Sequence, residues 1–164
     1  MTVTIKDIIQ QHLEAVKTGI IQRMAQQGRT ASGRSAASLE VKASDTGGSL
    51  EGSSSFLVME HGRGPGKVPK DFNSIIREWI IAKGISYQDL TPKNGTPEQG
   101  LTRLTGAIVH SILTKGTKLY RDHGYNDIFD TVLNEELDKI ADESVGVFTA
   151  DVDRIHEEET KEET

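Results

Sequence analysis

The residues best suited to chemistry lie in a short glycine-rich segment that reads Glu-His-Gly-Arg-Gly-Pro-Gly-Lys over residues 60–67. Glu60 and His61 are adjacent titratable side chains and could in principle form an acid–base pair. General-base catalysis also needs a nucleophile or a metal ion within reach, and no neighbouring residue supplies one. The segment therefore predicts no catalytic site.

The same segment does not meet the requirements of a nucleotide-binding loop. Such a loop has four residues between its first glycine and the Gly-Lys pair, and Ser or Thr follows the lysine. Here three residues separate Gly62 from Gly66, Val68 follows Lys67, and Pro69 blocks the expected helix start. We expect no phosphate site.

The remaining candidate residues for catalysis or metal binding, cysteines and histidines, also predict no site. The chain has no cysteine, which excludes disulfides, thiolate chemistry and Cys-based zinc sites. Its histidines show no metal-ligand spacing: His12, His61, His110, His123 and His156. His12 and His110 lie on or near apolar helix stripes, so we expect both to be core or boundary residues with satisfied hydrogen bonds. We predict no enzyme activity, no cofactor and no metal.

The N-terminal segment predicts a long amphipathic helix. Thr4 and Asp7 have the spacing of a capping box, and Gly28 ends the pattern. Apolar residues recur at helical spacing: Ile5, Ile8, Ile9, Leu13, Val16, Ile20, Ile21 and Met24. Such a stripe favours packing on a sheet; the alternative is that part of it meets a neighbouring subunit.

The next segments predict a hairpin and a central helix. Leu39, Val41 and Ala43 alternate with polar residues, and residues 45–48 have turn chemistry, so we expect pairing with residues 49–53. The apolar run 56–59 is too short to distinguish helix from strand. A helix follows Asp71 and ends near Gly84. It carries the only tryptophan, Trp79, which we predict to be buried.

The C-terminal half predicts two more helices. Pro97 suits the first turn of one that ends at Gly116, and another begins at Asn126 or Asp127. Residues 145–148 are ambiguous between a short strand and a break, so strand and helix both stay open for residues 145–156. The predicted fold class is α+β: a small antiparallel sheet packed against a long N-terminal helix, with additional C-terminal helices. We expect one domain over residues 1–150 and an acidic, flexible tail over residues 151–164.

Residues 56–85 carry a resemblance to a known family. An apolar run, the glycine-rich segment, a proline and then Ile-Ile-Arg-Glu-Trp-Ile-Ile-Ala-Lys-Gly-Ile resemble tail-component and head-tail joining proteins of tailed bacteriophages. Two weaker similarities flank this stretch. Residues 29–39 resemble the family's Thr-Gly-Arg-Leu-x-x-Ser segment, although Ala-Ser separates Thr30 from Gly33 and Ser35 replaces the leucine. Residues 113–117 resemble its late Lys-Gly-Thr turn.

The resemblance implies a structural virion protein in the head-tail connector, or neck, that serves head-tail joining or tail completion. It implies a ring-forming homo-oligomer whose partners are itself and other phage neck and tail proteins. We expect assembly in the cytoplasm of the host bacterium, and no membrane partner.

The glycine-rich loop and the basic face after it are the predicted protein interface. The candidate residues are Gly62, Arg63, Gly64, Pro65, Gly66, Lys67 and Lys70. Three glycines make the loop costly to order, and a close contact with a neighbour would give them a purpose. The alternative is a plain connecting turn.

The basic patch from Arg63 to Lys83 also supports an alternative function. It carries five basic residues against two acidic ones in a chain of net charge −6. Such a patch could serve a small nucleic-acid-binding protein, although few aromatic residues are available for base stacking. It could equally be a solvated face.

Overall fold

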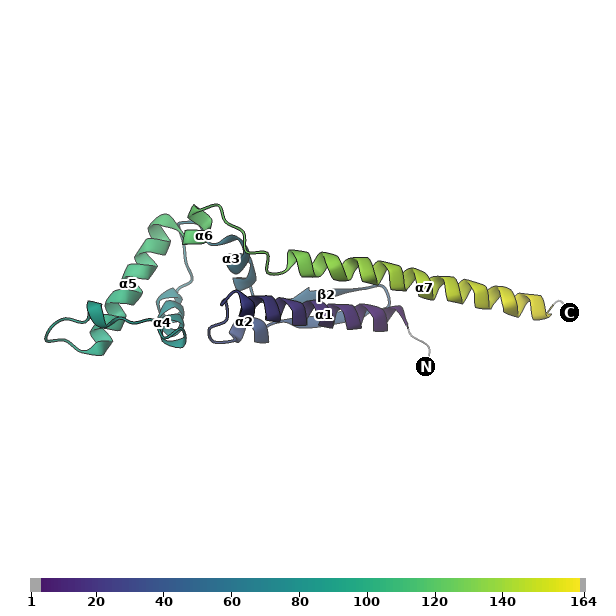
Figure 1. Ribbon diagram of the computed structural model, residues 1–164, viewed down its shortest axis with the longest axis horizontal. Helices are drawn as coiled ribbons and strands as arrows, with labels where there is room; N and C mark the ends of the chain where they lie inside the picture. Colours follow the sequence, from purple (N-terminus) through teal and green to yellow (C-terminus); the bar gives the residue numbers. More distant parts are fainter. Residues whose placement is uncertain (1–3, 163–164) are drawn as a thin grey trace. The chain divides into compact units, whose positions relative to one another are not determined.

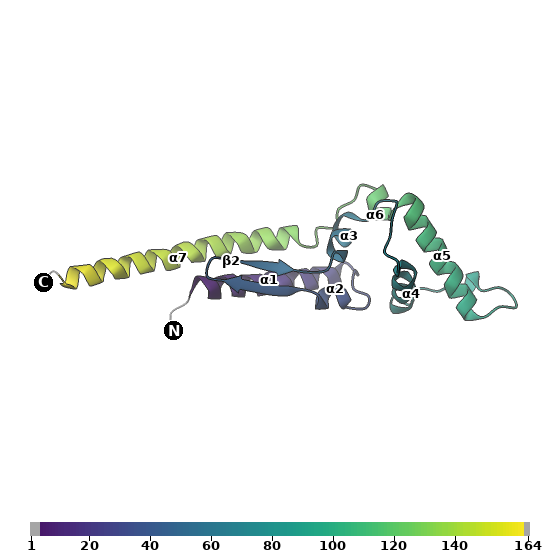
Figure 2. The same ribbon diagram turned by 180° about the vertical axis from the view of Figure 1, so that it is seen from behind.

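The computed structural model describes the backbone of residues 4–162 and the side chains of residues 4–156 (Figures 1 and 2). The described chain contains helices and one two-stranded antiparallel sheet, which confirms the α+β class. Its internal contacts divide it into two compact units. Unit 1 comprises residues 4–27, 38–53 and 127–162, and unit 2 comprises residues 28–37 and 54–126.

Unit 1 contains the long N-terminal helix α1 (Ile5–Gln26), the strands β1 (Glu40–Ser44) and β2 (Gly47–Glu51), and the C-terminal helix α7 (Asp130–Glu162). The predicted capping box is present, because the Asp7 amide donates to Thr4 Oγ1 and the Thr4 amide donates to Asp7 Oδ2. The strands pair with Val41 opposite Leu50 and Ala43 opposite Gly48. The second strand thus begins at Gly47, two residues earlier than expected.

Helix α1 is the centre of unit 1, since it contacts the hairpin on one side and α7 on another. This confirms the expectation that its stripe packs on a sheet. Its buried residues are Ile8, His12, Leu13, Val16, Ile20 and Met24. Two glycines allow close packing: a Cβ at Gly48 would lie 2.5 Å from Ile9 Cγ2, and one at Gly19 would lie 2.6 Å from Val132 Cγ1.

Helix α7 settles the ambiguous C-terminal region. It continues through residues 145–156 without a strand or a break, because one glycine inside a helix, Gly146, costs only about 1 kcal/mol. Asp127 accepts hydrogen bonds from the Thr131 amide and hydroxyl just before the helix. In Figure 1 the helix extends past the start of α1. The predicted tail is described as backbone to residue 162; its side chains from residue 157 and residues 163–164 lie outside the described part.

Unit 2 contains α2 (Arg34–Ala37), α3 (Ser55–His61), α4 (Phe72–Ala82), a 3-10 turn η1 (Gln88–Leu90), α5 (Pro97–Lys115) and α6 (Lys118–Arg121). Helix α4 packs against α5, which also contacts η1. Residues 56–59, for which the sequence could not distinguish helix from strand, form part of helix α3. Pro97 begins α5 and Gly116 ends it, and Gly84 adopts φ 62° beyond α4, as predicted.

Two burial predictions for unit 2 are wrong. Trp79 is 40% exposed, and His110 is also exposed. Helix α4 has more apolar residues than one contact face can cover. It buries Phe72 and Ile80, which leaves Trp79 at the edge. His110 lies on α5 next to the buried Val109, but it points to the solvent side of that helix.

Candidate assembly surfaces

The predicted interface loop, residues 62–67, packs against the segment that joins α5 to α6. The Gly66 amide donates to the Leu113 carbonyl at 2.9 Å, and the Thr117 amide donates to the Arg63 carbonyl at 2.8 Å. The Arg63 amide in turn donates to Thr117 Oγ1 at 2.9 Å. Three hydrogen bonds therefore hold the loop to residues 113–117 within the same unit.

This internal packing explains two of the loop glycines. Gly62 has φ 77°, and a Cβ there would lie 2.5 Å from the Tyr120 amide nitrogen. A Cβ at Gly64 would lie 3.1 Å from the Tyr120 ring, and Gly116 opposite the loop has φ 78°. A contact with a neighbour is not needed to account for these glycines, so the physical argument made from them for an interface no longer applies. The interface itself stays a prediction.

Most of the predicted basic patch is engaged inside the chain. The Arg63 guanidinium donates to the Lys67 carbonyl at 2.7 Å and lies 5.6 Å from the centre of the Phe72 ring. Arg77 forms an ion pair with Glu98 at 2.6 Å, and this hydrogen bond lowers the pKa of Glu98. Lys83 donates to the Gly28 carbonyl. Three of the five basic residues are thus not free to recognise a partner without giving up a contact.

The exposed basic residues of unit 2 lie instead around the loop and α6. We call this set the basic surface: Lys67, Lys70, Lys115, Lys118 and Arg121, all exposed. The hydrogen bond from the Gly66 amide to the Leu113 carbonyl brings the backbone next to Lys67 to the end of α5, which carries Lys115. Tyr120, 46% exposed, lies among them with its ring against Gly64. Of these five side chains, Lys118 forms an ion pair in the described part of the chain, a 3.6 Å contact with Asp122.

The pair of Glu60 and His61 does not form an acid–base site. Glu60 is fully buried, whereas His61 is exposed with its ring 5.5 Å from that of Tyr125. Consecutive residues on a helix point about 100° apart, so one faces the interior of unit 2 and the other faces solvent.

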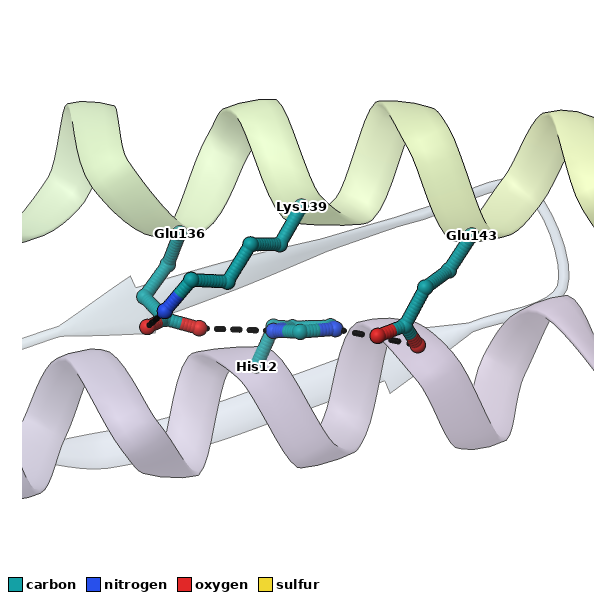
Figure 3. Close-up of polar contacts among 4 residues, drawn as sticks. All are labelled: His12, Glu136, Lys139 and Glu143. Atoms are coloured by element: carbon teal, nitrogen blue, oxygen red, sulfur yellow. Dashed lines mark hydrogen bonds and ion pairs between the residues drawn. The ribbon is translucent and has the colours of Figure 1, made fainter.

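A charged cluster with a buried histidine at its centre joins α1 to α7 (Figure 3). His12 is 4% exposed, and its Nδ1 lies 2.6 Å from Glu136 Oε2. Its Nε2 lies 3.2 Å from Glu143 Oε2, an ion-pair distance without the alignment of a hydrogen bond. Lys139 completes the cluster with Nζ 2.5 Å from Glu136 Oε1. The imidazole therefore lies between two carboxylates that are two turns apart on α7.

The cluster shifts its own proton equilibria. The hydrogen bond to Glu136 raises the pKa of His12, and burial opposes that shift only in part. Hydrogen bonds from Lys139 and then from His12 lower the pKa of Glu136. Both shifts favour the charged forms, so the cluster is an ion-paired clamp between the two long helices. The sequence correctly predicted a buried His12, but only its Nδ1 is hydrogen-bonded, and nothing in the sequence indicated its partners.

A second feature that the sequence analysis missed is an exposed apolar stripe on α7. We call it the α7 stripe: Leu137, Val145, Phe148, Val152 and Ile155. Val145 is 65% exposed and Phe148 is 67% exposed. The last four members follow a 3-4-3 spacing, which places them on one side of a helix. That spacing was visible in the sequence but was obscured by Gly146 and the β-branched residues around it.

Comparisons with family models, with curated proteins and with solved structures return no match. No described helix combines the length and apolar character needed to cross a membrane. Within the described residues, no group of three or more metal-ligating side chains is arranged to hold a metal ion.

Proposed function

We propose that this chain is a structural subunit that assembles with copies of itself. The observation that carries the proposal is the α7 stripe. Its large apolar side chains are about half to two-thirds exposed on one helix face. Removing such apolar surface from water is favourable, so a partner that covers it would bind with a gain in free energy. Contiguous apolar surface of this kind marks interaction sites in monomeric proteins.

The helix that bears the stripe gains little stability of its own. Helices of about 12–15 residues without tertiary contacts are marginal in water. The C-terminal part of α7 continues past the start of α1 (Figure 1). A partner that covers the stripe would stabilise this part of the helix.

The setting that the sequence resemblance implies is the virion of a tailed bacteriophage. There the subunit would form part of the head-tail connector as a ring, in contact with other neck and tail proteins. An extended helix with one apolar face suits such an assembly, because helix-in-groove contacts join subunits through a few anchoring side chains.

Two experiments test this proposal. Light scattering coupled to size exclusion should give a mass above that of one chain, rising with concentration, and negative-stain images should show closed rings. In a phage that encodes the chain, disrupting its gene should produce a lysate of full heads and separate tails. A monomer at every concentration, together with joined virions after disruption, would refute the proposal.

Nucleic-acid binding is the second candidate, favoured by the basic surface. Phosphate contacts make such binding strongly salt-dependent. The measurement is the fluorescence anisotropy of labelled double-stranded DNA at rising salt. Binding that weakens steeply with salt, in a protein that does not self-associate, would favour this second function.

A further inference from the structure

We propose that α7 of one copy docks on the basic surface of unit 2 in a second copy, so that subunits join head to tail. This inference rests on the proposed function and names its interface. The docking helix contributes the α7 stripe and the acidic residues beside it. The receiving surface contributes Lys67, Lys70, Lys115, Lys118 and Arg121 around Tyr120.

The first argument is the division of charge between the two units. In the sequence, the segments of unit 1 (residues 1–27, 38–53 and 127–164) carry 19 acidic and 7 basic residues, a net −12. The segments of unit 2 (residues 28–37 and 54–126) carry 6 acidic and 12 basic residues, a net +6. The chain's overall −6 therefore conceals two units of opposite sign. Opposite potentials attract unlike surfaces and repel like ones.

The second argument concerns the charge of α7 itself. Between Asp130 and His156 the helix carries eight acidic and two basic residues. Asp142 and Asp151 flank the α7 stripe along the helix. Two copies of α7 packed against each other would bring like charges together, at a cost in free energy. The oppositely charged surface that this chain provides is in unit 2.

The third argument is the length of the helix, which holds the stripe well away from the start of α7. At 1.5 Å per residue, Val145 lies roughly 22 Å along α7 from Asp130, and Ile155 roughly 38 Å. The basic surface ends at Arg121, nine residues before the helix starts. A straight helix thus presents the stripe at a distance from its own first turn, where the surface of a second copy can cover it.

The receiving surface also has apolar and aromatic area for the stripe. Tyr120 is 46% exposed among the lysines, and Tyr125, which follows α6, is 48% exposed. Aromatic rings with a polar end suit an interface that is apolar at its centre and charged at its rim. Phe148 and Val152 would contact these rings while Asp151 and Asp153 meet Lys118 and Arg121.

A head-to-tail contact uses different surfaces on the two partners. A pair joined in this way keeps a free basic surface on one copy and a free α7 on the other, so that further copies add until the ring closes or a filament grows. The contact predicts assemblies larger than dimers, which separates it from a symmetric pairing of two α7 helices.

Charge reversal with rescue by mixing tests this geometry in the full-length chain. One variant carries Lys118→Glu and Arg121→Glu, and the other carries Asp151→Lys and Asp153→Lys. All four side chains are exposed, so circular dichroism and thermal unfolding should match the unmodified chain. Each variant alone should associate about tenfold more weakly or worse, because the side chains proposed to meet at the contact now carry charges of the same sign.

An equimolar mixture of the two variants should regain assembly, since each variant supplies the surface that the other lacks. A matched control, Lys93→Glu with Arg103→Glu, makes the same charge change elsewhere in unit 2 and should assemble normally. Sedimentation velocity at 50 mM and 500 mM salt measures the size of the assemblies in every sample. The ratio of nucleic-acid to protein absorbance verifies that no nucleic acid is bound.

The outcomes separate this interface from the proposed function. If the unmodified chain assembles and the mixture stays dissociated, or if the reversal on unit 2 has no effect, the head-to-tail contact is wrong while self-assembly stands. If the unmodified chain is monomeric at all concentrations, or assembles only with nucleic acid, both are wrong. If each variant by itself stays dissociated, the mixture of the two assembles and the control variant assembles like the unmodified chain, the contact is supported.

Discussion

Replacing His12 with alanine should destabilise unit 1 by about 3 kcal/mol at pH 6. The estimate combines a charge-assisted hydrogen bond to Glu136, typically about 1.5–3 kcal/mol, with the packing lost when a 4%-exposed ring is removed. Glu143 adds little, because its side chain is 50% exposed and screened by solvent. For a chain of this size the melting temperature should fall by about 6–12 °C.

The same cluster predicts how stability depends on pH. The pKa of His12 is raised on folding, so its contribution is complete below the unfolded value of about 6.5 and is lost as pH rises through the folded pKa. The pKa of Glu136 is lowered, so its contribution is present above about 4.3 and is lost as pH falls through the folded pKa. The clamp is therefore strongest between roughly pH 4.5 and 6.5.

Thermal unfolding from pH 3 to 9 measures both effects. His12→Gln keeps a hydrogen-bonding side chain but cannot titrate, so it should flatten the alkaline loss of stability. His110→Gln, at an exposed site in unit 2, controls for loss of a histidine elsewhere. A double-mutant cycle of His12→Ala and Glu136→Gln should give a coupling free energy of about 1–2 kcal/mol for unfolding. Zero coupling, or an unchanged pH profile in His12→Gln, would refute the clamp.

Three further changes probe the packing of each unit. Gly48→Val should cost about 1–3 kcal/mol in urea unfolding, because its side chain would overlap Ile9, whereas Gly47→Val, with open space around it, should cost much less; equal costs would contradict the close approach. Gly62→Ala should lower the melting temperature of unit 2, since it adds about 1–3 kcal/mol of backbone strain at φ 77° and a clash with backbone; an unchanged melt would mean that the loop moves freely. Trp79 should be accessible to acrylamide in dilute protein, and Trp79→Ala should cost about 1–2 kcal/mol rather than the 3–5 kcal/mol of a buried ring; a shielded, blue-shifted emission in the monomer would show that the side chain is covered.

The ends of the elements could be predicted from the sequence because their causes are local. Thr4 and Asp7 cap α1 across three residues, Pro97 fixes the first turn of α5, and the glycines after α4 and α5 adopt positive φ where each helix stops. The hairpin was predicted for the same reason, although its second strand begins at Gly47, two residues closer to the turn than expected. These signals act within a few residues, so no tertiary information is needed to read them.

Residues 145–156, for which the sequence left strand and helix both open, lie at the limit of such local signals. Val145, Gly146 and Val147 weaken a helix by a few tenths of a kcal/mol to about 1 kcal/mol each, which leaves helix and strand nearly balanced on propensity alone. The regular hydrogen bonds of α7 on both sides decide in favour of helix. With the helix continuous, Val145 and Phe148 line up with Val152 and Ile155 on one exposed face.

Tertiary packing alone determined which side chains meet. Glu136 and Glu143 are two turns apart and share a helix face, but nothing in the sequence places that face against His12, more than a hundred residues away. The interface loop was located from its glycines, yet only the fold revealed that Gly62 and Gly64 make room for Tyr120. Local propensity sets where an element begins and ends, whereas the partner of each face depends on packing between segments far apart in the chain, which the sequence does not encode at short range.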